Sequence, residues 1–95
     1  MAAYMIVNID ILDVAAFKEY QSQFPALMEK FGGHYFVRGG AAEQVAGDWE
    51  PKRLIVIEFP TLGHARRLVA SEEYQALKRI RDRSTRTDFI LVEGV

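Results

Sequence analysis

The segment from Arg53 to Phe59 constrains the fold more than any other part of this 95-residue chain. It reads Arg-Leu-Ile-Val-Ile-Glu-Phe, a density of β-branched and aromatic residues that is typical of a strand. One face of such a strand carries Ile55, Ile57 and Phe59, and the other carries Leu54 and Val56. Because both faces are apolar, the strand needs cover on each side, whereas a sheet with one face in water alternates apolar and polar residues.

Apolar periodicity predicts one strand and one long helix before this segment. Residues 4–11 are typical of a strand, whose first face carries Met5, Val7, Ile9 and Ile11. Apolar side chains then recur at spacings of three and four through residues 17–31, which predicts an amphipathic helix between an N-cap at Asp13 and Gly32. Pro25 lies inside this pattern and predicts a kink or a restart, since proline removes one backbone hydrogen bond.

The glycine pairs at 32–33 and 39–40 bound a short aromatic segment, residues 34–38, that predicts the second strand. Residues 41–45 would continue this strand past a bulge at the second glycine pair. After the strand at 53–59, the pattern predicts a helix over residues 62–70 with Thr61 as its N-cap. A second helix would begin after the N-cap Ser71 and bury Tyr74, Leu77 and Ile80. Residues 89–92 would form the last strand.

This order of elements is that of a ferredoxin-like βαββαβ fold of the α+β class, built as one domain over residues 1–95. Helices would cover one face of a four-stranded antiparallel sheet. The last strand is also apolar on both faces, because Phe89 and Leu91 alternate with Ile90 and Val92. An uncovered apolar face marks an interaction surface, and the simplest cover is a second copy. The sequence therefore predicts a homodimer that packs sheet to sheet.

Composition argues against several other classes of function. The net charge is −1, and the basic cluster formed by Lys78, Arg79, Arg81, Arg83 and Arg86 contains no stacking aromatic residues, so we expect a solvated face and no nucleic-acid site. The chain has no cysteine, no secretory leader and no long apolar run, which predicts a cytoplasmic protein without a membrane span. The two histidines lack metal-ligand spacing and no glycine-rich phosphate loop occurs, so we expect neither a metal nor a cofactor.

Four polar residues lie on predicted strands among apolar neighbours: Asn8, His34, Arg38 and Glu58. If their faces coincide, they line one pocket, and a buried Glu58 needs a partner such as Arg38, His34 or a tyrosine. Arg38 would hold an anionic oxygen, Glu58 or His34 would move a proton, and Asn8 would orient the substrate. The alternative is structural: an Arg38–Glu58 salt bridge that fixes the register of the dimer, and a His34 that bonds to backbone.

The connection between the second and third strands adds Asp48 and Trp49 as candidate substrate contacts. Trp49 would close the mouth of the pocket, or it would pack the hairpin onto the core. A single bulge would reverse the face of every residue beyond it, so the shared pocket depends on regular pairing of the strands.

Several segments together resemble a known family: Phe31-Gly32-Gly33, Val37-Arg38-Gly39-Gly40, Gly47-Asp48-Trp49-Glu50-Pro51, Ile55 to Pro60, Ser71 to Leu77, and Val92-Glu93-Gly94. The resemblance is to the DUF1330 family of domains of unknown function and runs nearly end to end. It implies a dimeric α/β-barrel protein and no established activity. The chain departs from the family pattern at His34, where a basic residue is usual, at Leu68-Val69, where an aromatic pair is usual, and at Glu73, where proline is usual.

The wider superfamily includes cofactor-free monooxygenases, muconolactone isomerases, haem-degrading enzymes and binding modules. The first functional hypothesis is a small cofactor-independent enzyme, monooxygenase- or isomerase-like, that acts on a small organic acid, carbonyl or aromatic compound. The second is a non-catalytic module for ligand binding or assembly. A third, an RNA-binding domain, would display aromatic residues on the sheet face that is expected to hold the partner.

Overall fold

The computed structural model describes all 95 residues and confirms the predicted fold class. In chain order the elements are β1 (Ala3–Ile11), α1 (Val14–Lys30), β2 (His34–Arg38), β3 (Arg53–Phe59), α2 (Leu62–Ala70), α3 (Glu72–Ser84) and β4 (Thr85–Glu93). The last helical region is thus two helices, as predicted. No helix is both long enough and apolar enough to cross a membrane.

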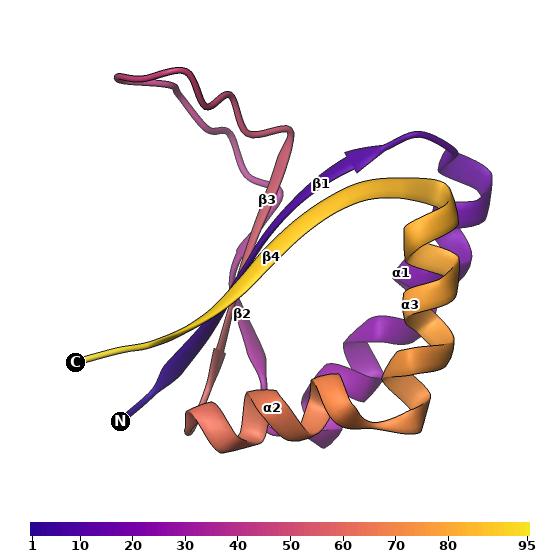
Figure 1. Cartoon of the computed structure of the whole chain (residues 1–95), viewed down its shortest axis with the longest axis vertical. Coiled ribbons are helices and arrows are strands. Elements are labelled where there is room, and N and C mark those ends of the chain that lie inside the picture. Colours follow the sequence, from indigo (N-terminus) through magenta and orange to yellow (C-terminus); the bar gives the residue numbers. More distant parts are fainter.

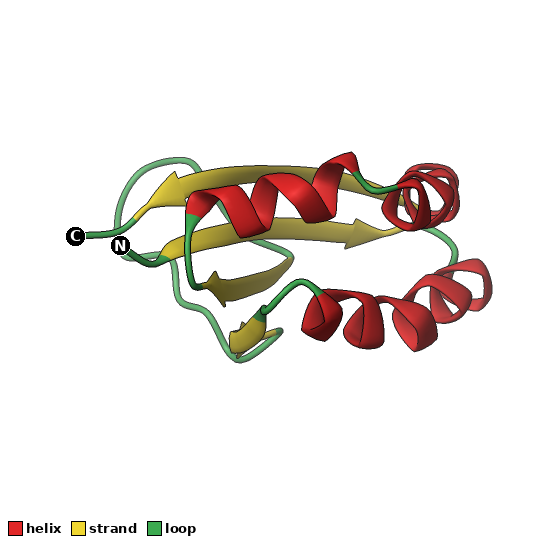
Figure 2. Ribbon diagram, turned by 90° about the horizontal axis from the view of Figure 1, so that it is seen from below, coloured by secondary structure: helices red, strands yellow, loops and turns green.

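The four strands form one antiparallel sheet in the order β2-β3-β1-β4. All three helices lie on one side of this sheet, which leaves its other side uncovered (Figure 1). In Figure 2, viewed from below, helices lie in front of the strands and toward one end of them. We call the uncovered side the open face.

The core lies between the sheet and the helices. Alternate residues of β1, from Ala3 to Ile9, are buried on the helix side, as are Ile57 and Phe59 of β3. The predicted stripe of α1 packs on them through Phe17, Tyr20, Phe24, Leu27 and Met28. Burial of each large apolar side chain contributes about 1.5–3 kcal/mol, so this layer supplies most of the drive to fold.

The predicted helix caps are confirmed. The side chains of Asp13, Thr61 and Ser71 accept hydrogen bonds from the backbone N–H groups three residues later. Gly32 follows α1 with φ of 85°, a conformation that favours glycine, and its N–H donates to the carbonyl of Glu29. These caps fix where each helix starts and, at Gly32, where α1 ends.

At Pro25 the sequence predicted either a kink or a restart; helix α1 continues through the proline, so there is no restart, and its buried stripe lies on both sides of this residue. Two predicted boundaries were wrong. Residues 41–45 do not continue β2; they are exposed and belong to a long connection, residues 39–52, that projects beyond the sheet (Figure 1). Strand β4 begins at Thr85, earlier than predicted, because its polar start pairs with the end of β1, where Asp10 lies opposite Arg86.

The open face is largely apolar, as was predicted from strands that carry apolar residues on both faces. Its residues are Tyr4, Ile6 and Asn8 of β1, Leu54, Val56 and Glu58 of β3, and Asp88, Ile90 and Val92 of β4. Ile90 is 59% exposed and lies opposite Ile6 of the neighbouring strand. An apolar surface of this extent on a single chain is typical of an interaction surface.

Candidate functional site

A β-bulge in β2 divides the predicted pocket between the two faces of the sheet. His34 pairs with Glu58 and Tyr35 pairs with Ile57, but the register then shifts, so that Val37 lies opposite Val56 and Arg38 opposite Ile55. A bulge places two residues of one strand against one residue of its partner. Arg38 therefore lies on the helix side with Ile55, whereas His34 lies on the open face with Glu58.

The helix side of the sheet encloses a cavity of about 40 Å³ between the four strands and helices α1 and α3. Its walls are mostly apolar and aromatic, and its polar lining consists of three tyrosines, Gln21, Arg38, Arg53 and Arg81. No aspartate, glutamate or histidine lines it. The cavity as it stands has room for about three water molecules. It is therefore a small, cationic recess inside an apolar core.

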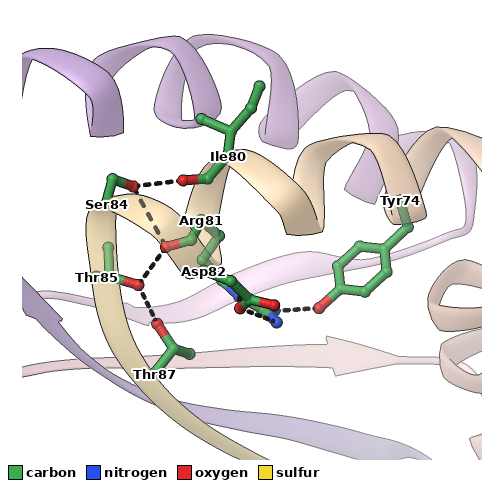
Figure 3. Close-up of polar contacts among 7 residues, drawn as sticks. All are labelled: Tyr74, Ile80, Arg81, Asp82, Ser84, Thr85 and Thr87. Atoms are coloured by element: carbon green, nitrogen blue, oxygen red, sulfur yellow. Dashed lines mark hydrogen bonds and ion pairs between the residues drawn. The ribbon is translucent and has the colours of Figure 1, made fainter.

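Arg81 is the deepest of these cations. It is only 5% exposed, and its guanidinium donates to the hydroxyl of Tyr74 and pairs with Asp82 at 3.0 Å (Figure 3). The guanidinium carbon also lies 5.2 Å from the centre of the Phe89 ring. The prediction that Arg81 belongs to a solvated basic face was wrong, because aromatic residues of α3 and β4 cover it and Tyr74 and Asp82 satisfy its donors.

The turn from α3 into β4 is held by a chain of hydroxyl hydrogen bonds that fixes the position of Arg81 (Figure 3). Ser84 Oγ donates to the carbonyl of Ile80 at 2.6 Å, and Thr85 Oγ1 donates to the carbonyl of Arg81 at 2.7 Å. The hydroxyls of Thr85 and Thr87 are 2.7 Å apart. The carbonyl of Arg81 is among the last four of α3, which have no backbone partner within the helix, so the bond from Thr85 helps to satisfy it.

Arg38 and Arg53 lie at the other side of the cavity, on neighbouring strands. The guanidinium of Arg38 lies over the ring of Tyr35, 4.6 Å from its centre. Arg53 Nε is buried and has no hydrogen-bond partner. Neither arginine forms a salt bridge. The positive charge at this side is therefore not neutralised by a salt bridge.

The tyrosines of the cavity stay protonated at neutral pH. Burial raises the pKa of Tyr20, Tyr35 and Tyr74 above the ordinary value, because it disfavours the charged phenolate. Their hydroxyls therefore act as hydrogen-bond donors or neutral acceptors. Together with the arginines they favour a bound anion, and the cavity contains no side chain that would take up a proton near pH 7.

On the open face, Glu58 forms a cluster with His34 and Tyr4. The Tyr4 hydroxyl donates to Glu58 Oε2 at 3.0 Å, and His34 Nε2 lies 3.2 Å from Glu58 Oε1. The bond to Glu58 raises the pKa of Tyr4. The rings of Tyr4 and His34 both contact Phe36, at 5.8 and 5.3 Å between centres. We call these four residues the open-face cluster.

The hypothesis of an Arg38–Glu58 pair was therefore wrong, since the two residues lie on opposite faces of the sheet and Glu58 is paired with His34 and Tyr4. Tyr4, Arg53 and Arg81 were missed as polar members of the two sites. Tyr4 could have been recognised as a member of this cluster, because alternate residues of a strand share a face and Tyr4 is on the same face of β1 as Asn8; in the structure it lies opposite Glu58.

Asn8 and Trp49 lie together on the open face, away from the cavity. They line a shallow depression with Ile6, Leu54 and Asp88, and Asn8 Oδ1 accepts a hydrogen bond of 2.8 Å from the backbone N–H of Lys52. Trp49 is 60% exposed. Asp48 is exposed in the same connection and lines neither the cavity nor this depression. Asn8 thus anchors the connection to β1.

No group of three or more histidine, cysteine, aspartate or glutamate side chains is arranged to hold a metal ion.

One known protein family matches almost the whole chain. The family model described as DUF1330, a domain of unknown function, matches residues 2–95. The chain belongs to the DUF1330 family. None of the curated proteins matches it significantly.

Solved structures show that this DUF1330 protein has the dimeric α/β-barrel fold. It is similar to the protein of unknown function RPA0582 from Rhodopseudomonas palustris, with a TM-score of 0.80 and 13% identity over 99% of this chain and 82% of that one. It is also similar to SnoaB, a cofactor-independent oxygenase from Streptomyces nogalater, with a TM-score of 0.64 and 12% identity over 99% of this chain and 93% of that one. A putative antibiotic biosynthesis monooxygenase from Nitrosomonas europaea gives a TM-score of 0.58 and 12% identity over 98% and 90%. At these identities the likeness concerns the fold alone.

Proposed function

We propose that this DUF1330 protein binds a small organic acid, as its anion, in the cavity between the sheet and the helices. The observation that carries the proposal is the lining: three arginines converge on an apolar recess that contains no carboxylate. Guanidinium groups bind carboxylates through paired, charge-assisted hydrogen bonds, and such bonds are stronger away from water. Arg38 keeps the role that the sequence suggested for it, which is to hold an anionic oxygen.

The size of the cavity favours a small acid over a large aromatic compound. A space of about 40 Å³ fits only a few non-hydrogen atoms. Arg38 is exposed at the mouth, so a shift of its side chain would admit a somewhat larger ligand. The apolar walls would receive a short hydrocarbon body once the carboxylate is bound.

Catalysis is the second candidate, in the form of a cofactor-independent reaction of the monooxygenase or isomerase kind. It is supported by the fold shared with SnoaB and by the three cations, which would stabilise an enolate formed from a bound acid or carbonyl compound. The predicted acid–base residues Glu58 and His34 lie on the opposite face of the sheet and do not line this cavity. Binding is therefore better supported than turnover.

A homodimer forms the other part of the proposal, with a second copy covering the open face. Support comes from the position of all three helices on one side of the sheet (Figure 1). It also comes from the exposed apolar residues on the other side, such as Ile90 and Val92. In this arrangement the open-face cluster would lie at the dimer contact and fix its register. Trp49, 60% exposed in the single chain, would be covered with the depression that it lines.

The proposal is tested by titrating the isotope-labelled protein with butyrate and following its amide signals by NMR. We expect shifts at cavity residues such as Tyr35 and Tyr74, and about tenfold weaker binding after Arg38→Gln, because one charge-assisted contact is lost. Arg79→Gln, on the exposed side of α3, is the matched control and should bind like wild type. Absence of binding, or shifts confined to the open face, would contradict the proposal.

The second candidate, catalysis, is tested by following the exchange of the α-protons of 2-oxobutyrate for deuterium in D2O.

A further inference from the structure

Arg53 Nε is the one buried side-chain nitrogen or oxygen in the chain that has no hydrogen-bond partner. Arg53 begins β3, lies opposite Ile9 of β1 and lines the cavity. A buried donor without an acceptor costs about 1–3 kcal/mol, and folded proteins rarely leave one. An acceptor supplied by a ligand in the cavity would remove this cost.

The residues that line the cavity come from all four strands, from β2 at one edge to β4 at the other. Arg38 of β2, Ile55 of β3, Val7 of β1 and Phe89 of β4 form one row of paired residues on the helix side. Neighbouring strands are about 4.8 Å apart, so the two ends of this row are separated by roughly three such spacings. Arg38 and Arg53 are at the end nearer β2, and Arg81 lies against Phe89 at the end nearer β4.

The two ends differ in their balance of charge. At the β4 end, Arg81 is neutralised by Asp82 and is hydrogen-bonded to the hydroxyl of Tyr74. At the β2 end, Arg38 and Arg53 have no acidic partner. A ligand carboxylate is therefore favoured at the β2 end only. A second carboxylate at the β4 end would have to compete with Asp82 for Arg81.

We infer that the ligand is a short monocarboxylate whose carboxylate binds Arg53 and Arg38 and whose uncharged body extends under the sheet toward Tyr74 and Phe89. This inference rests on the proposed function and specifies the class and orientation of its ligand. Arg53 acts as the anchor, because its buried Nε lacks an acceptor, while Arg38 closes the site from the exposed mouth. Walls such as Val7 and Ile55 enclose the body.

The test compares three probes on the full chain by calorimetry and NMR: butyrate, its uncharged amide butyramide, and the dicarboxylate succinate. Wild type should bind butyrate at least about tenfold more tightly than either of the others. Butyramide lacks the charged contact to the arginines, and succinate would bury a second carboxylate without a partner. Arg53→Gln should weaken butyrate binding to the level of butyramide, so that the preference for the acid disappears. Arg53→Lys retains the charge without the guanidinium and should recover part of that preference.

Arg79→Gln again serves as the control, and circular dichroism reports whether each variant is folded. Butyrate binding that Arg53→Gln leaves unchanged would overturn the inference while leaving the proposed function intact. Equal or tighter binding of succinate would also overturn it. Failure of all acids to bind would refute the proposed function itself, so the two failures are distinct.

Discussion

At the scale of single residues, the polar groups of the helix side are unusual because they lie inside the core. Arg81, Tyr74 and Tyr20 are all buried among apolar side chains. A buried cation is tolerated when hydrogen bonds and a counter-ion satisfy it, and Arg81 has both in Tyr74 and Asp82. Buried polar groups of this kind cost stability unless each has a hydrogen-bond partner. Arg53 is the exception among them, because its buried Nε has none.

The buried hydroxyl of Tyr20 makes stability fall in alkaline solution. Burial raises its pKa above the ordinary value of 10.0, so the unfolded chain gives up this proton more readily than the folded chain does. The contribution of Tyr20 to the free energy of unfolding is complete below about pH 10 and declines as the pH rises above that value. We expect Tyr20→Phe to lose less stability than wild type between about pH 8 and pH 11, as measured by urea unfolding. Equal losses for the two proteins would show that Tyr20 does not contribute.

At the scale of the elements, the junction between α2 and α3 depends on one serine. Ser71 Oγ accepts from the N–H of Tyr74 at 3.1 Å and donates to the carbonyl of Leu68 at 2.7 Å, so it serves the end of one helix and the start of the next. We expect Ser71→Ala to lower the free energy of unfolding by about 1–2 kcal/mol, as measured in urea. Ser22→Ala, on the exposed side of α1, is the control and should change it by less than about 0.5 kcal/mol. Similar effects at both serines would contradict this role.

The elements were largely predictable from the sequence because their signals are local. The spacing of Phe17, Phe24 and Leu27 defines the buried side of α1 without reference to the rest of the chain. Caps such as Asp13 and Ser71 act over three residues. At Pro25 the sequence left a kink and a restart open, because the packing of α1 on the sheet, which is not local, decides whether the helix continues.

The candidate site was less predictable because it depends on pairing between strands. The bulge between Tyr35 and Val37 moves Arg38 to the helix side, and nothing in the segment itself specifies where the extra residue lies. Arg53 was included in the third strand without a role of its own, and Arg81 was read as part of a basic face. Their burial follows from the tertiary arrangement of α3, β3 and β4, which charge patterns along the chain do not reveal.

At the scale of the whole molecule, the two faces of the sheet carry different sets of residues. The helix side contains the core and the cationic cavity, and the open face contains the open-face cluster and a broad apolar surface. A chain this small buries only about two-thirds of its unfolded surface, so cover for the open face would add substantially to its stability. Under the proposed function, the sheet would separate ligand binding from assembly, so a substitution on one face should leave the other function intact.

The proposed dimer predicts the effect of a charge placed on the open face. Ile90 is 59% exposed in the single chain, and Ile90→Lys would bury a charge in the contact, whereas Leu12→Lys changes a residue that is 60% exposed outside the sheet. We expect light scattering to show a dimer for wild type and Leu12→Lys at about 10 μM and a monomer for Ile90→Lys.

Circular dichroism should show that Ile90→Lys still folds, because the side chain lies outside the core. Because the cavity lies on the other side of the sheet, the monomeric variant should also still bind butyrate. A monomeric wild type, or a dimer unaffected by Ile90→Lys, would refute the proposed dimer across the open face. Loss of butyrate binding together with the dimer would instead mean that the cavity needs the partner for its shape.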